Sequence, residues 1–143
     1  MYRKVDILEF FLIHPGGPFW ARKDEGAWSI PKGLAEGDEG LIQTAQREFF
    51  EETGIRPAPP YHDLGSLKTK AGKMLYVWAF VGEWNPVDGI VSNRITIEFP
   101  YKSGKFIDIP EADRGEWMNP EKARQMINPS QVPFLERAIS VLP

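Results

Sequence analysis

Apolar and polar residues recur with two different periods along the chain, and each period predicts a different element. Residues 4–14 form a run rich in Val, Ile, Leu and Phe, which predicts one long and largely buried strand. Residues 41–53 instead carry apolar side chains at helical spacing: Leu41, Ile42, Ala45 and Phe49. We therefore expect a helix there, ending at Gly54 because glycine readily adopts the left-handed conformation that closes many helices.

Beyond this helix the pattern favours short strands separated by turns. Two strand pairs are expected, residues 62–70 with 73–84 and residues 94–99 with 105–109. Shorter extended segments are expected at residues 19–22, 28–30 and 116–118, and loops are expected at residues 15–18 and 34–40. A short helix is expected to begin at Pro120, and a final helix is expected over residues 133–142. The pattern predicts an α/β fold, with a mixed sheet covered by helices on both faces.

Length and composition predict one domain and limit the classes of partner. The 143 residues contain no repeat or linker, so residues 1–143 are expected to form a single domain. With no cysteine, disulfides and thiolate metal sites are excluded, which fits a reducing, cytoplasmic location. No apolar run approaches the roughly 18 residues of a membrane span. A net charge of −3 argues against an extended nucleic-acid surface, but it permits a small phosphorylated substrate held through a metal ion.

Three acidic residues crowd one face of the predicted helix. Glu51 and Glu52 lie three and four positions after Glu48, so the carboxylates fall within roughly 100° of one another around the helix axis. Such acids repel unless a cation lies between them, and Mg²⁺ or Mn²⁺ prefers carboxylate oxygens. The alternative is a charged, solvated surface that binds no metal.

The segment around these acids resembles the Nudix box, G-x5-E-x7-R-E-U-x-E-E-x-G-U, where U is a bulky apolar residue. All its fixed positions match without a gap: Gly33, Glu39, Arg47, Glu48, Phe49, Glu51, Glu52, Gly54 and Ile55. The resemblance implies a Nudix-type α/β/α sandwich with a mixed β-sheet. It also implies a Mg²⁺- or Mn²⁺-dependent pyrophosphohydrolase, in which water attacks a phosphorus atom of a nucleoside diphosphate-linked substrate. Such substrates include nucleoside triphosphates and dinucleoside polyphosphates.

The same resemblance implies roles within the box. Glu51 and Glu52 are expected to be direct metal ligands, Glu48 a ligand or a base, and the backbone carbonyl of Lys32 a further ligand. Arg47 would hydrogen-bond Glu51 one turn later and brace Glu39, unless these residues form an ordinary surface ion pair.

A further acid is expected outside the box. Glu111 lies six residues before Trp117, the spacing at which MutT-type Nudix proteins place a loop glutamate before a tryptophan. The resemblance therefore makes Glu111 a catalytic and metal-binding candidate. Asp113 and Glu116 are close enough to take its place, and a solvated acidic loop is the remaining alternative.

Substrate recognition is predicted less directly. The ammonium of Lys32 would suit a phosphate oxygen, and the string from Trp28 to Glu39 resembles Nudix members that cleave dinucleoside polyphosphates or diphosphoinositol polyphosphates. The tyrosine and the proline typical of the diadenosine and ADP-ribose types are absent at their positions after the box. Gln131 resembles a MutT-type purine-reading asparagine, although a helix-start glutamine facing water is the alternative.

Alternative functions and assemblies remain open at the level of sequence. A nucleotide-sensing Nudix module without activity is one alternative, and a diphosphoinositol polyphosphate hydrolase is another. An isopentenyl diphosphate-type isomerase would need catalytic cysteine chemistry, which this chain lacks. His14 and His62 are expected to be loop or strand-end residues rather than catalysts. Phe50 points away from both faces of the helix and is expected to pack on a loop or on a second subunit, which leaves a homodimer open.

Overall fold

Strand β2 (Leu8–Pro15) lies at the centre of the fold, which a computed structural model describes for residues 1–32 and 39–142. It pairs antiparallel with β1 (Tyr2–Lys4) on one side and with β7 (Ala112–Met118) on the other. Because side chains alternate between the two faces of a strand, β2 contributes to two separate apolar cores.

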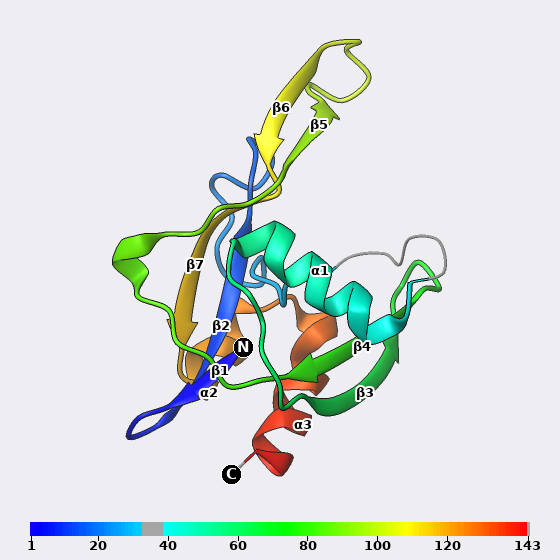
Figure 1. The fold of residues 1–143 in the computed structure, drawn as a ribbon. Helices are drawn as coiled ribbons and strands as arrows, with labels where there is room; N and C mark the ends of the chain where they lie inside the picture. The colour runs from blue at the N-terminus through cyan, green and yellow to red at the C-terminus, as the bar shows by residue number, and fades with distance from the viewer. Residues whose placement is uncertain (33–38, 143) are drawn as a thin grey trace.

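One core lies on each face of this sheet (Figure 1). Phe10 and Leu12 of β2 pack with residues of α2 (Pro120–Met126) and α3 (Val132–Val141). Phe11 and Ile13 pack on the opposite face, with Phe49 of α1 (Leu41–Thr53). The expected α/β/α sandwich is therefore confirmed, with α1 forming one helical layer and α2 and α3 the other.

The remaining strands form two antiparallel pairs. They are β3 (His62–Lys68) with β4 (Met74–Ala79), and β5 (Arg94–Glu98) with β6 (Phe106–Pro110). The β5–β6 hairpin extends away from the layered body (Figure 1). Short 3₁₀ turns occupy Pro86–Asp88 (η1) and Pro129–Gln131 (η2). Isolated parallel bridges, Tyr2 with Val81 and Trp28 with Ile127, supply the parallel contacts of the mixed arrangement.

Two of the expected strands are wrong. Residues 4–14 do not form one strand, because the chain turns between β1 and β2 and leaves Val5 and Ile7 75% and 56% exposed. The polar Asp6 at the centre of that turn is the sequence signal for the break. Residues 19–22 form turns rather than a strand, and Phe19 is exposed with the ammonium of Lys23 lying 3.7 Å from its ring centre.

Helix α1 has the predicted limits and the predicted end. Gly54 takes a left-handed φ of 77°, and its N–H donates to the Phe50 carbonyl at 2.7 Å. Phe50 is 38% exposed, and the guanidinium of Arg56, in the segment after the helix, lies 4.5 Å from its ring centre. Most of the expected loop 34–40 falls outside the described residues. Within the described part of the chain, no helix has the length and apolar character needed to cross a membrane.

Candidate metal centre

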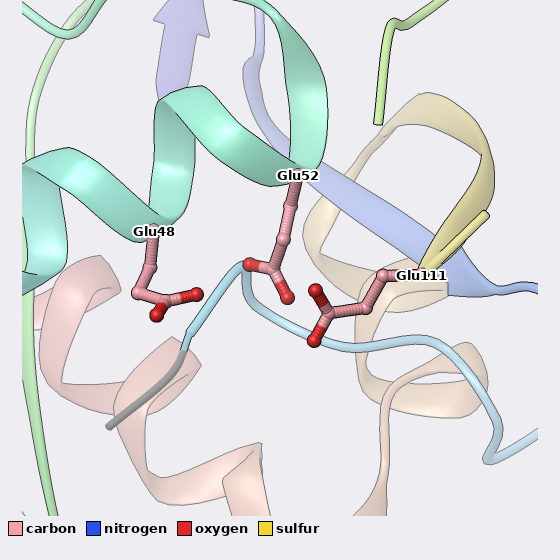
Figure 2. Close-up of side chains that lie close together, drawn as sticks. All are labelled: Glu48, Glu52 and Glu111. Atoms are coloured by element: carbon pink, nitrogen blue, oxygen red, sulfur yellow. The ribbon is translucent and has the colours of Figure 1, made fainter. Parts of the chain in front are cut away.

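Three glutamates from two parts of the chain meet beneath α1. Glu48 and Glu52 extend from successive turns of the helix, and Glu111 reaches toward them from the turn between β6 and β7 (Figure 2). Each offers a carboxylate oxygen, and these three oxygens lie within 4.8 Å of one another. The arrangement brings hard oxygen donors close enough together to hold a divalent cation.

Burial makes this carboxylate cluster electrostatically unfavourable without a cation. Glu48 and Glu52 are buried, and Oε2 of Glu52 has no hydrogen-bond partner among the described residues. Burial, followed by the charges of Glu111 and Glu48, raises the pKa of Glu52 to about 9. Burial also raises the pKa of Glu48, although the charge of Arg47 opposes the shift.

Backbone hydrogen bonds hold Glu111 against the end of the helix. The Glu111 N–H donates to the Asn93 carbonyl at 2.9 Å, and the Asn93 N–H donates to the Glu51 carbonyl at 2.6 Å. On the other side, the Gly16 N–H donates to the Glu111 carbonyl at 3.0 Å. A Cβ on Gly16 would lie 2.1 Å from the Pro110 carbonyl oxygen, so this close approach requires glycine. The position of Glu111 is therefore fixed by backbone hydrogen bonds that connect it to the end of α1 and to the end of β2.

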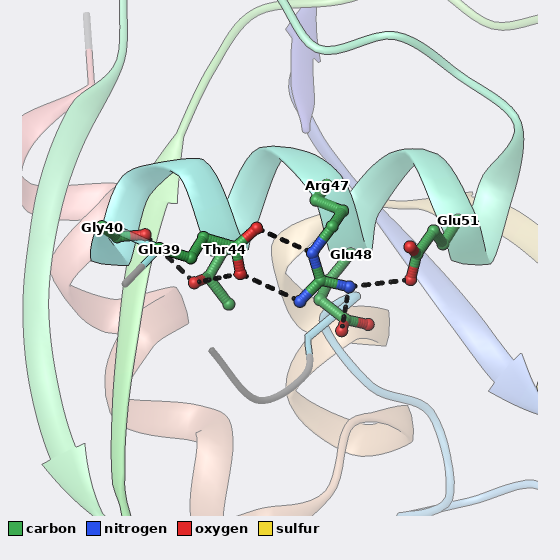
Figure 3. Close-up of polar contacts among 6 residues, drawn as sticks. All are labelled: Glu39, Gly40, Thr44, Arg47, Glu48 and Glu51. Carbon is green, nitrogen blue, oxygen red and sulfur yellow. Dashed lines mark hydrogen bonds and ion pairs between the residues drawn. The ribbon is translucent and has the colours of Figure 1, made fainter. Parts of the chain in front are cut away.

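Arg47 joins the other acids of the box into one network (Figure 3). Its Nε and Nη2 bind both oxygens of Glu39, at 2.8 and 3.0 Å, and its Nη1 binds Glu48 and Glu51, at 2.9 and 3.0 Å. Both contacts expected of Arg47 are thus present. Hydrogen bonding to Glu39, above all, raises the pKa of Arg47 further above its ordinary value, so it is a permanent cation.

Glu51 and Lys32 occupy positions different from those of the three clustered acids. The Glu51 carboxylate binds Arg47 and is not part of the cluster that the described residues form. The backbone of Lys32 forms a hydrogen bond with the Glu52 carboxyl, while its side chain is exposed. Their roles as metal ligands stay predictions, and Gly33 lies outside the described residues.

The two acids near Glu111 have other partners. Asp113 binds Nδ1 of His14 at 2.9 Å, and Glu116 binds the ammonium of Lys122. Of the three candidate acids in this segment, Glu111 is the one that joins Glu48 and Glu52.

Gln131 is turned into the protein instead of toward water. It is 3% exposed, its Oε1 accepts from the Ile30 N–H at 2.9 Å, and its Nε2 donates to Ser29 Oγ at 3.1 Å. The amide thus holds residues 29–30 in place, just before Lys32.

Several supporting residues were not identified from sequence. Thr44 donates from its hydroxyl to Glu39 at 2.8 Å, and its position three residues before Arg47 is a usable signal, since both lie on one helix face. Asn93 acts through its backbone, which side-chain identity does not reveal. His14 is completely buried beside Trp28, and its contact with Asp113 spans 99 positions in the chain.

The residues present fit a divalent cation. A cation among Glu48, Glu52 and Glu111 would balance the repulsion between the carboxylates and bind the Glu52 oxygen that lacks a hydrogen bond. The donors are all carboxylate oxygens, which suits Mg²⁺ or Mn²⁺ better than the softer metals.

Comparisons with known proteins identify chains that are similar to this one. The chain is 35% identical over 54 residues to phosphatase NudJ from Escherichia coli K12 and to phosphatase NudJ from Shigella flexneri. Each match covers 35% of this chain, and the chain spans only 35% of the length of these curated relatives. The solution structure of the E. coli ORF135 protein matches with a TM-score of 0.53 and 21% identity, over 93% of this chain and 81% of that one, which shows a shared fold.

The decisive comparison is at the level of the family. A family model described as the NUDIX domain matches residues 9–138, which include the acidic face of α1, the Glu111 turn and most of both cores. The chain therefore belongs to the NUDIX domain family, the Nudix hydrolases.

Proposed function

We propose that this protein is a Mg²⁺- or Mn²⁺-dependent pyrophosphohydrolase that cleaves a phosphoanhydride bond in a small nucleoside diphosphate-linked substrate. The observation that carries the proposal is the cluster of Glu48, Glu52 and Glu111, whose carboxylate oxygens lie within 4.8 Å of one another. One buried oxygen of that cluster, on Glu52, has no hydrogen bond within the described part of the chain.

The cluster of Glu48, Glu52 and Glu111 would bind the cation and would also accept a proton. When bound, the cation supplies Lewis-acid chemistry, which neutralises phosphate oxygens and makes a water more acidic. Glu48, Glu52 and Glu111 would bind it, and a carboxylate of the cluster would accept the proton that the attacking water loses. Glu51 is linked to Glu48 through Arg47, which donates a hydrogen bond to each, and we propose Glu51 as a further ligand.

Arg47 sets the geometry of this chemistry without reacting. Its planar guanidinium makes two hydrogen bonds to Glu39 and one each to Glu48 and Glu51, so it fixes the orientation of Glu48 relative to Glu52. The Lys32 ammonium, exposed beside the cluster, is suited to a phosphate oxygen of the substrate.

A substrate screen tests the proposal. Nucleoside triphosphates, dinucleoside polyphosphates, nucleotide sugars and diphosphoinositol polyphosphates are each incubated with the protein and Mg²⁺ or Mn²⁺, and again with excess chelator. We expect metal-dependent product release from at least one class, and ¹⁸O-labelled water identifies the phosphorus atom that is attacked. A protein that binds nucleotides but releases no product with either metal would instead be a sensor, and the proposal would be wrong.

A further inference from the structure

A cleft beside the acidic cluster has an unusual lining. It has a volume of about 630 Å³, and its walls come from the β3–β4 turn on one side and from residues 128–131 on the other. Lys32 lines it as well, and the backbone of Lys32 forms a hydrogen bond with Glu52. Lys32 therefore connects the cleft to the candidate metal centre, and the cleft is large enough for a sizeable substrate group.

Three lysines gather at this cleft. Lys68 ends β3, Lys70 lies in the turn that follows, and both side chains are exposed, as is that of Lys32. Among the ion pairs that the described residues form, none involves these three ammonium groups. The chain as a whole has a net charge of −3, so the concentration of positive charge is local. Like charges close together are unfavourable without an anion between them.

The same cleft has little with which to read a nucleobase. Phe134 is the aromatic residue in its described lining, and it is only 1% exposed, so it presents no ring face for stacking. Gln131 is only 3% exposed, and its amide binds the Ile30 N–H and the Ser29 hydroxyl, so little of it is accessible to a base edge. Besides the three lysines, the lining offers the exposed amide of Asn128, whose Oδ1 already accepts from the Ser130 N–H and hydroxyl. Cationic groups are therefore the main feature that the lining offers to a ligand.

We propose that this cleft binds phosphate groups in the part of the substrate that lies beyond the cleaved phosphoanhydride bond. Lys68 and Lys70 would then be specificity-determining residues that favour phosphate-rich substrates over nucleotide sugars. The proposal rests on the proposed pyrophosphohydrolase function. The required chemistry, several phosphates on the distal part of the substrate, is common to nucleoside polyphosphates, dinucleoside polyphosphates and diphosphoinositol polyphosphates.

The kinetic test compares three substrates that share an adenosine with a fourth that lacks it. Diadenosine tetraphosphate and ATP are phosphate-rich, whereas ADP-ribose carries a sugar beyond its diphosphate, and a diphosphoinositol polyphosphate carries phosphates without a nucleoside. Lys68→Gln and Lys70→Gln should each lower kcat/KM for the phosphate-rich substrates by about tenfold, the usual effect of losing one hydrogen bond to a charged group. For ADP-ribose the change should be less than about threefold. Lys105→Gln, at the tip of the distant β5–β6 hairpin (Figure 1), is the matched control and should change neither.

The relative losses within the phosphate-rich group identify the source of the phosphates. If the lysine substitutions lower kcat/KM more for the diphosphoinositol polyphosphate than for diadenosine tetraphosphate, the cleft is assigned to an inositol phosphate. If they lower it more for diadenosine tetraphosphate, the cleft is assigned to a nucleotide. Equal losses with ADP-ribose and diadenosine tetraphosphate would overturn the proposal, as would a wild-type preference for ADP-ribose.

A binding measurement separates this inference from the proposed function. Inorganic tripolyphosphate is titrated into the wild-type protein and the Lys68→Gln/Lys70→Gln double variant, with excess chelator present, and heat release is measured. We expect the dissociation constant to rise at least tenfold in the double variant, and less so at high salt, where the charges are screened. Equal affinity in both proteins would refute the assignment of the cleft. A wild-type protein that cleaves none of the four substrates would refute the proposed function, while the titration would still decide what the cleft binds.

Discussion

Glu52 is the residue on which the electrostatics of the candidate site depend most. It is 4% exposed, it lies beside two other carboxylates, and one of its oxygens lacks a hydrogen bond within the described residues. Without a cation the protonated form is favoured, which is why the pKa rises from 4.5 to about 9. In the proposed metal site this side chain would exchange its proton for a metal ion, so metal affinity should increase as the pH rises.

This shift predicts how the stability of the metal-free protein depends on pH. Between about pH 4.5 and 9 the folded protein holds a proton on Glu52 that the unfolded chain has released. That stabilisation is complete at low pH and is lost as the pH rises through the folded-state pKa. We expect Tm, measured in excess chelator, to fall between about pH 5 and pH 9.

Two variants test whether Glu52 causes this fall in Tm. Glu52→Gln removes the titrating group, so its Tm should change less over the same range than that of the wild type. Glu25→Gln, which changes an exposed acid, should keep the wild-type slope. If the Glu52→Gln protein lost as much stability with rising pH as the wild type, Glu52 would not be the group responsible.

Arg47 gives a second prediction at the residue scale. Lysine keeps the positive charge but cannot make the paired hydrogen bonds to Glu39 while also reaching Glu48 and Glu51. Arg47→Lys should therefore reduce metal affinity or turnover by about 10–100-fold, the usual effect of changing a residue that orients ligands. The Mg²⁺ dependence of the initial rate measures the change.

The control for Arg47→Lys is Arg124→Lys. Arg124 pairs with Glu136 on the surface, where both side chains are exposed and the ion pair contributes little to stability. The Arg124→Lys substitution should leave the metal dependence of the rate unchanged. Equal effects of the two substitutions would show that the hydrogen-bond geometry of Arg47 is not required.

The side-chain contacts of the box were only partly predictable from spacing. Helical periodicity places Glu48, Glu51 and Glu52 on one face, and it correctly brings Arg47 to Glu51. Spacing does not fix side-chain rotamers, however. In the structure the Glu51 carboxylate turns to Arg47, whereas those of Glu48 and Glu52 turn toward Glu111.

At the scale of elements, the turn between β6 and β7 matters most because it carries Glu111. This turn is clamped between β2 and the end of α1 through the backbones of Gly16 and Asn93. The end of β2 packs tightly here, and Gly16 leaves no room for a side chain against Pro110. The position of the loop acid is thus set by backbone contacts from two other elements.

Gly16→Ala should displace that turn. The new methyl group would lie 2.1 Å from the Pro110 carbonyl oxygen, so either β2 or the turn must move. Because small displacements of catalytic groups are costly, we expect turnover to fall about 10–100-fold. Steady-state rates and Tm should be measured together, since overpacking also lowers stability.

Gly104→Ala separates strain from displacement. Gly104 has a φ of 76° at the tip of the β5–β6 hairpin, and a Cβ there would have no neighbour within 4 Å. The substitution strains the backbone but does not contact the Glu111 turn, so turnover should stay near that of the wild type. A comparable loss of turnover in both variants would contradict the positioning role of Gly16.

Elements with a clear hydrophobic periodicity or a clear terminating residue were predictable. Residues 41–53 have one apolar and one acidic face and a glycine at the end, and α1 has those limits. Residues 19–22 have an apolar, aromatic start that suggests a strand, but the structure forms turns there and leaves Phe19 exposed. Propensity alone does not specify a strand, because a strand also needs a neighbour to pair with.

At the scale of the whole molecule, the layered fold follows from strand β2. Its continuous apolar residues face both cores, so the strand must be covered on both sides. The sequence predicted this arrangement, but contacts between distant residues were not accessible from local pattern. The pairing of His14 with Asp113 and the bridge through Asn93 arise only when the layers assemble.

We propose that the carboxylates clustered beneath α1 perform metal-dependent hydrolysis, and Glu52→Gln tests this proposal most directly. Turnover of the best substrate from the screen is measured with Mg²⁺ at saturation for each variant, with Glu25→Gln as the control. We predict that Glu52→Gln lowers turnover by about 10²–10⁴-fold while the control retains wild-type activity, since positioned catalytic groups typically contribute that much. Near wild-type turnover in a folded Glu52→Gln protein would contradict the assignment of this cluster as the active site.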